Sequence, residues 1–213
     1  MPTIAPQQAE RLALCDLFLK VGPDAPTLCE GWATYDLAAH LVIRERKPLS
    51  GPGLVMGGAA ARLTARILTR AKQTHSYSEL VSLVRRGPPL VLAPFDRAMN
   101  LTEYFVHHED VRRGGGDTTP RSGAEAAQVE EALWQMLHRS AKFMTRPVKA
   151  IGIDLVRPDG EVIHARPGSP LATITGAAGE FVLRLSGRGD AARVEVGGAS
   201  DAVAVVRDAG FGI

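Results

Sequence analysis

The sequence predicts an α+β protein, with an N-terminal up-down four-helix bundle followed by a small α+β domain. Residues 1–146 carry apolar side chains at helical spacing, interrupted by Gly and Pro. From residue 147 the pattern changes to short β-rich runs separated by turn signals. The 213 residues are enough for two domains that each bury a core. We therefore expect one domain over 1–146 and a second over 147–213.

The early helices are predicted by periodicity and by the residues that end it. The first helix is expected over residues 5–21, where the apolar spacing continues until a Gly-Pro pair. The second is expected to begin after Thr34 and to end before Pro48. A stretch rich in Ala, Leu and Arg predicts a third helix over residues 58–72.

Capping signals predict where the later helices begin. Ser76 and Glu79 form a capping-box signature for a short helix. Asp96 is a suitable N-cap for a long helix that ends at a run of three glycines. Ser122 and Glu125 form a second capping-box signature, which opens a helix that reaches about residue 144. Four substantial helices, together with the short ones, fit an up-down bundle.

The second domain is expected to open with a β-hairpin. The tripeptide Pro158-Asp159-Gly160 separates two alternating runs, IGIDLV and EVIHAR, and is a strong turn signal. The runs LATIT and ARVEVGG predict two further strands. Helices are expected over GAAGEFVLRLSGRG and SDAVAVVRDA.

Composition argues against several classes of partner. The 25 basic and 23 acidic residues are well mixed, and no basic run with interleaved aromatics occurs, so we expect no nucleic acid. No run of about 18 apolar residues occurs and the N-terminus lacks a signal-peptide pattern, so we expect no membrane partner. Two cysteines form no disulfide framework, which favours a reducing, cytoplasmic setting.

The strongest candidate for chemistry is the segment NLTEYFVHHEDVRR. Glu103 and His107 are four residues apart, so they share a helix face, roughly 6 Å apart along the axis. A carboxylate and an imidazole at this spacing can hold one divalent ion. His108 points about 100° away from that face. Asp110 follows His107 by three residues, so we expect it to orient the imidazole ring from behind.

A third ligand is expected from another helix. His40 lies in DLAAHLV, among leucines, and we expect it to point into the bundle. Two histidines and one glutamate leave open positions, as in a catalytic rather than a closed structural zinc site. From the residues alone two other interpretations stay open: a core histidine without a metal, and an ordinary Glu–His pair on a helix surface.

A resemblance adds to this interpretation. The stretches LCEGWATYDLAAHLVIRER and NLTEYFVHHEDVRR resemble the DinB/YfiT-like metal-binding superfamily, and within it the mycothiol-dependent maleylpyruvate isomerase group, including an uncharacterised actinobacterial subfamily. The resemblance covers nearly the whole chain and includes LRLSGRG. It implies a DinB-like bundle followed by an isomerase C-terminal or sterol-carrier-like domain. It also implies that His40, Glu103 and His107 hold a divalent metal, usually zinc, with nickel or another ion open.

The segment LSGRG contains a candidate substrate-binding residue. The resemblance implies that this domain supplies basic side chains to the site, and Arg188 can bind a small anionic substrate in a bidentate manner. The alternative is an ordinary surface arginine in a turn. Cys15 and Cys29 are expected to pack as small apolar groups, and we predict no cysteine nucleophile.

The function expected from the sequence is that of a metal-dependent enzyme, because a bound ion with an open position lowers the pKa of a coordinated thiol or water. The resemblance implies a low-molecular-weight thiol such as mycothiol, used for transfer or isomerisation. Two alternatives stay open: a hydrolase that uses metal-bound water, and a non-enzymatic module that binds a small molecule or metal. The sequence does not decide the substrate, the metal, or whether the chain is a monomer or a homodimer.

Overall fold

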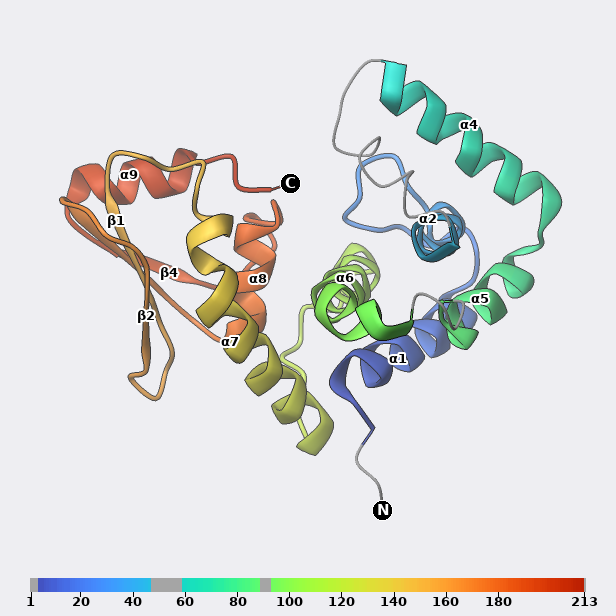
Figure 1. The fold of residues 1–213 in the computed structure, drawn as a ribbon, viewed down its shortest axis with the longest axis horizontal. Coiled ribbons are helices and arrows are strands. Elements are labelled where there is room, and N and C mark those ends of the chain that lie inside the picture. The colour runs from blue at the N-terminus through green and yellow to red at the C-terminus, as the bar shows by residue number, and fades with distance from the viewer. Residues whose placement is uncertain (1–3, 47–58, 89–92, 213) are drawn as a thin grey trace. The chain divides into compact units, whose positions relative to one another are not determined.

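The computed structural model describes residues 4–46, 59–88 and 93–212, and the chain divides into two compact units, Met1–Pro120 and Arg121–Ile213 (Figure 1). The first unit is helical. The second contains a mixed sheet with helices. The α+β fold class predicted from the sequence is therefore confirmed.

The first unit is built from helices that pack around one apolar core. They are α1 (Pro6–Val21), α2 (Thr34–Arg46), α4 (Ala59–Thr74), α5 (Tyr77–Arg86) and α6 (Ala93–Gly114). Helix α1 packs against α5 and α6, and α2 packs against α4 and α5. Fully buried core side chains include Leu14, Phe18, Leu37, Leu80 and Val84. This packing fixes α2 and α6, the two helices that carry the predicted metal ligands.

The capping box predicted for α5 is confirmed. The Ser76 side chain accepts a hydrogen bond from the backbone N–H of Glu79, and the Glu79 carboxylate accepts one from the backbone N–H of Ser76 at 2.7 Å. The prediction of Asp96 as the next N-cap is wrong, because α6 begins three residues earlier, at Ala93. Pro94 suits that earlier start, since its fixed backbone angle is compatible with a first helical turn.

The second predicted capping box is also wrong. Helix α7 (Ala124–Met144) has Gly123 as its N-cap, and no side-chain capping bond forms there in the described structure. Gly123 has φ of 95°, in the left-handed region that favours glycine. Because Gly123 is the N-cap, Ser122 lies one position before it and cannot act as the cap. The predicted ends of two helices, near Pro48 and residue 58, lie outside the described residues.

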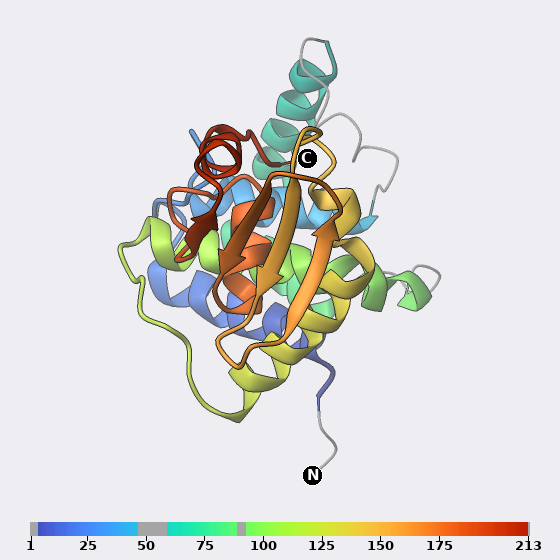
Figure 2. The same cartoon turned by 90° about the vertical axis from the view of Figure 1, so that its left-hand side faces the viewer.

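The second unit contains a four-stranded sheet in the order β2-β1-β3-β4. Its strands are β1 (Gly152–Val156), β2 (Val162–Arg166), β3 (Leu171–Thr175) and β4 (Glu195–Gly198), and its other helices are α8 (Ala178–Leu185) and α9 (Ser200–Asp208). The hairpin predicted at the Pro-Asp-Gly turn is confirmed, since β1 and β2 pair antiparallel. Strands β1 and β3 are parallel. Figure 2 shows this sheet with α7 and α8 behind it.

Helix α7 lies on the C-terminal side of the division between the units. It packs against α8 and β2, and the indole Nε1 of Trp134 donates to Glu161 Oε2 at 2.7 Å. The units therefore separate before α7, whereas the boundary expected from the sequence follows it. The periodic apolar residues of α7 show that the helix buries one face, but they do not show which other elements that face packs against. Among the described helices, none has the length and apolar character needed to cross a membrane.

The loop between α1 and α2 lies against the C-terminal end of α6. The backbone N–H of Leu28 donates to the carbonyl of Asp110 at 3.0 Å. Thr27 approaches Gly114 so closely that a Cβ atom at position 114 would be 2.6 Å from the Thr27 Cα. Glycine at this position thus allows the loop to contact the helix that carries the predicted metal ligands.

We expect Gly114→Ala to destabilise the protein by about 1–3 kcal/mol, because the new methyl group would collide with backbone atoms of the loop. Gly115→Ala is the matched control, since its Cβ would lie 3.4 Å from the nearest atom, the carbonyl oxygen of Val111. Urea denaturation measures both variants. Equal free energies of unfolding for the two would contradict the close approach.

Candidate metal centre

Helices α2 and α6 bring three ligand-type side chains together. Glu103 Oε1 lies 3.2 Å from His40 Nε2 and 3.3 Å from His107 Nε2. One ligand atom from each residue lies within 4.8 Å of the other two. Ligands at the roughly 2.0–2.2 Å bond lengths of tetrahedral zinc are about 3.3–3.6 Å apart. The distances from Glu103 to the two histidines are therefore close to those between ligands of one divalent ion.

Local sequence explains why these side chains converge. Leu37 and Leu41 are buried next to His40 on α2, so the apolar packing of that helix turns the imidazole inward. On α6 the four-residue spacing aligns Glu103 with His107, as expected. The two imidazole rings meet edge to face, with centroids 5.2 Å apart.

Arg44 adds a positive charge beside the carboxylate. Its Nε lies 3.0 Å from Glu103 Oε1, and its Nη1 donates to the side-chain oxygen of Asn100. Burial raises the pKa of Glu103, but hydrogen bonds from His107 and His40 and the charges of His107 and Arg44 outweigh it, so that pKa lies well below its ordinary value. The carboxylate is consequently an anion at neutral pH, which is the form that binds a cation.

The two histidines differ in their protonation. Burial lowers the pKa of His40, which favours the neutral imidazole that a metal binds. Burial also acts to lower the pKa of His107, but hydrogen bonds with Asp110, Cys29 and Glu103 outweigh it and hold that pKa well above its ordinary value. A metal ion that binds His107 must therefore displace a proton.

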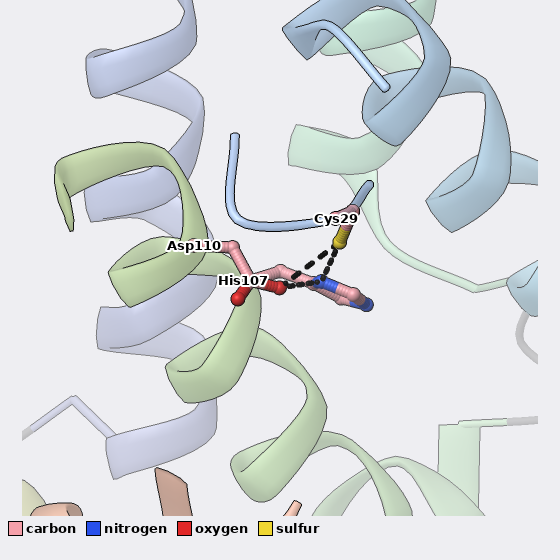
Figure 3. Close-up of side chains that lie close together, drawn as sticks. All are labelled: Cys29, His107 and Asp110. Carbon is pink, nitrogen blue, oxygen red and sulfur yellow. Dashed lines mark hydrogen bonds and ion pairs between the residues drawn. The ribbon is translucent and has the colours of Figure 1, made fainter. Parts of the chain in front are cut away.

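The other nitrogen of the His107 ring has its own partners. Asp110 Oδ2 lies 2.9 Å from His107 Nδ1, which is the contact expected from the three-residue spacing. The thiol of Cys29 donates to the same carboxylate oxygen at 3.2 Å and lies 4.0 Å from Nδ1. Figure 3 shows both side chains at one edge of the imidazole, with its second nitrogen pointing away from them.

Two sets of possible metal ligands therefore share one histidine. The first set is His40, Glu103 and His107, and the second is Cys29, His107 and Asp110. They use opposite nitrogens of the His107 ring. Histidines that bind metals commonly donate the other N–H to a carboxylate, which fixes the tautomer and the ring orientation. The fully buried Asp110 carboxylate fits that supporting role, so the first set fits a metal better.

Three residues that lie near the centre were not predicted to belong to it. Arg44 could have been predicted from the sequence, because it follows His40 by four residues and therefore lies on the same face of α2. Cys29 and Trp32 lie in a loop, where spacing does not predict direction. The Trp32 ring lies 5.3 Å from the His40 ring, centroid to centroid. Cys29 packs against the apolar core, as expected, but it is only half-buried and its thiol also makes a hydrogen bond that the sequence did not predict.

His108 and Arg188, the other two residues considered from the sequence, do not contact the three candidate ligands in the contacts described for them. His108 points away from the metal ligands, as expected, and its Nδ1 lies 3.1 Å from Glu10 Oε2 on α1. Arg188 belongs to the second unit, where its Nη1 donates to the carbonyl of Ser186 at 2.7 Å. Its contact with an anionic substrate stays a prediction.

The two cysteines should differ in reactivity. Cys15 is fully buried, and burial raises its pKa to about 12, whereas Cys29 is half-buried. Because the thiolate is the reactive form, iodoacetamide should label Cys29 in the native protein and Cys15 only after unfolding. Peptide mass spectrometry measures both. Comparable labelling of Cys15 in the native protein would contradict its burial.

The chain is similar to known proteins in its structure. No protein-family profile and no curated protein sequence matches the chain. The chain is similar to the crystal structure of the mycothiol-dependent maleylpyruvate isomerase, with a TM-score of 0.55, 17% identity and 90% of each chain covered. A histidine-to-alanine mutant of that enzyme gives a TM-score of 0.56 at 16% identity, also over 90% of each chain. The chain thus shares the fold of that isomerase, as its sequence led us to expect.

Proposed function

We propose that this protein is a divalent-metal-dependent enzyme that activates a low-molecular-weight thiol for transfer or isomerisation. The observation that carries the proposal is the convergence of His40 Nε2 and His107 Nε2 on one oxygen of Glu103. Two imidazoles and one carboxylate leave at least one position of a zinc ion open. A thiol that occupies this position loses its proton more easily and becomes a nucleophile at neutral pH.

The surroundings of the three ligands support this role. The negative charge of Glu103 would offset part of the charge of a bound ion, and Arg44 Nε, 3.0 Å from Glu103 Oε1, restrains that oxygen. His40 and His107 are almost fully buried, so water competes little with them for the ion. We assign zinc as the metal, because this ligand set is common in catalytic zinc sites, and nickel or another divalent ion fits the same donors.

The choice of a thiol draws on the fold. The similar solved structure is of an enzyme described as mycothiol-dependent, and we carry that dependence to this chain as part of the proposal. Arg188 is proposed to bind a small anionic substrate through its guanidinium group. Metal-bound water acting in hydrolysis, and simple binding of a metal or small molecule, are alternatives that the experiments below separate.

Metal analysis of protein purified without chelators should find one divalent ion per chain. His40→Ala should weaken zinc binding by more than the roughly 10–100-fold expected for a residue that only supports a ligand. His164→Ala is the matched control, because that imidazole is 80% exposed and contacts Asp154 in the second unit. The proposal fails if the wild-type protein binds no ion, or if the two variants bind zinc equally.

The reaction type can be tested with the metal-loaded protein. We expect transfer or isomerisation activity that requires an added low-molecular-weight thiol and that disappears in His40→Ala, because the ion generates the thiolate. Assays with and without thiol, against panels of electrophiles and esters, measure this. Hydrolysis without thiol would favour the hydrolase, and metal binding without activity on either panel would favour a binding module.

Zinc affinity should rise with pH from neutral pH upward. The pKa of His107 is raised, so its ring is protonated in the metal-free protein and must release that proton when zinc binds. The affinity should rise by about tenfold per pH unit until the pH exceeds this pKa, as for one released proton. Calorimetry in buffers of different ionisation enthalpy counts the proton. An affinity that is flat or falls over this range would show that His107 is not a ligand.

A further inference from the structure

Cys29 makes a specific polar contact although it is not one of the proposed metal ligands. Its thiol donates to Asp110 Oδ2 at 3.2 Å, and the same oxygen lies 2.9 Å from His107 Nδ1 (Figure 3). The Asp110 side chain is fully buried. A buried carboxylate is expensive unless it is hydrogen-bonded, so two donors on one oxygen strongly restrict its orientation.

The backbone around Cys29 is itself fixed. Thr27 Oγ1 accepts from the backbone N–H of Cys29 at 3.1 Å and donates to the carbonyl of Trp32 at 2.8 Å. The backbone N–H of Leu28 donates to the carbonyl of Asp110. Hydrogen bonds inside the loop and between the loop and α6 therefore fix the position of the thiol beside the carboxylate.

The distances argue against Cys29 as a metal ligand. A zinc ion bound to one sulfur at about 2.3 Å and one nitrogen at about 2.0–2.1 Å holds these atoms about 3.6 Å apart, whereas Cys29 Sγ and His107 Nδ1 are 4.0 Å apart. The 2.9 Å between His107 Nδ1 and Asp110 Oδ2 is a hydrogen-bond distance, shorter than two ligands of one tetrahedral zinc ion allow. The cluster has the geometry of a hydrogen-bonded chain.

We propose that Cys29 is a positioning residue for the metal centre. Its thiol fixes the Asp110 carboxylate, the carboxylate holds the proton of His107 at Nδ1, and His107 Nε2 is thereby presented to the metal. This inference rests on the proposed function in one respect, namely that the metal binds His107 through Nε2. The loop also contacts the other histidine, because Trp32 packs beside the His40 ring, so one short segment restrains both imidazoles.

The first test measures zinc affinity in competition with a chromophoric chelator. Cys29→Ala, which removes the donor, should bind zinc about 10-fold more weakly than the wild type. Cys29→Ser, which keeps a donor, should restore most of that affinity. Cys15→Ala is the matched control, because it removes a buried thiol from the same unit without contacting the site. Wild-type affinity in Cys29→Ala would overturn the proposal.

A double-mutant cycle tests whether Cys29 acts through Asp110. Asp110→Asn should weaken zinc binding, and the double variant Cys29→Ala/Asp110→Asn should bind no more weakly than Asp110→Asn alone. If the two losses multiply, Cys29 acts independently of the carboxylate and the proposal fails. Cobalt(II) provides the spectroscopic test. An intense near-ultraviolet sulfur-to-cobalt band that disappears in Cys29→Ala would show that Cys29 is itself a ligand.

A measurement on the metal-free protein separates this inference from the proposed function. The hydrogen-bonded Nδ1 proton of His107 should give a downfield NMR signal in the wild type and in Cys29→Ser, and it should broaden or vanish in Cys29→Ala. The signal is assigned by its loss in His107→Gln. If the wild type binds no zinc, the proposed function fails, and this signal alone decides the positioning role. A signal unchanged in Cys29→Ala overturns it.

Discussion

Helix α6 buries an unbroken run of four ionisable side chains, residues 107–110, and the first unit is arranged so that each has a partner. A buried polar group without a partner costs about 1–3 kcal/mol, and a charged group more. His108 Nδ1 is hydrogen-bonded to Glu10 on α1, and Glu109 forms an ion pair with Arg113 at 2.7 Å. Hydrogen bonds to this run connect both α1 and the loop that follows it to α6. The candidate metal centre is one part of the same arrangement.

A second buried network fixes the helices that carry the ligands. Glu45 Oε1 on α2 accepts from Arg11 Nη2 on α1 at 2.7 Å and from the hydroxyl of Tyr104 on α6. The Arg11 guanidinium also lies over the Tyr104 ring, 4.7 Å from its centroid. A buried ion pair adds little stability compared with apolar packing, but removal of one partner leaves an uncompensated charge. This network therefore restricts how far α2 and α6 can slide past each other. It thereby also restricts the separation of His40 from His107.

The sequence predicted those parts of the structure that depend on spacing within one element. The shared face of Glu103 and His107 and the antiparallel hairpin of β1 and β2 follow from fixed helical and strand periods. The inward direction of His40 follows from its apolar neighbours. The contact of Cys29 with α6 was not predictable, because a loop has no period that fixes the direction of a side chain. The division of the chain before α7 was missed for a related reason, since an amphipathic helix does not identify the surface it covers.

The loop between α1 and α2 has a register, as a strand in a sheet does. Thr27 contacts Gly114, Leu28 binds the Asp110 carbonyl, and Cys29 binds the Asp110 carboxylate, so three consecutive residues each have a fixed partner on α6. Surface loops usually tolerate insertions and deletions. Here the gain or loss of one residue between Thr27 and Cys29 would place every later side chain opposite the wrong partner. The part of the loop before Thr27 is fixed as well, because the carbonyls of Pro23 and Ala25 accept from the backbone N–H groups of Tyr35 and Thr34. This loop should therefore tolerate changes in length less well than an ordinary surface loop.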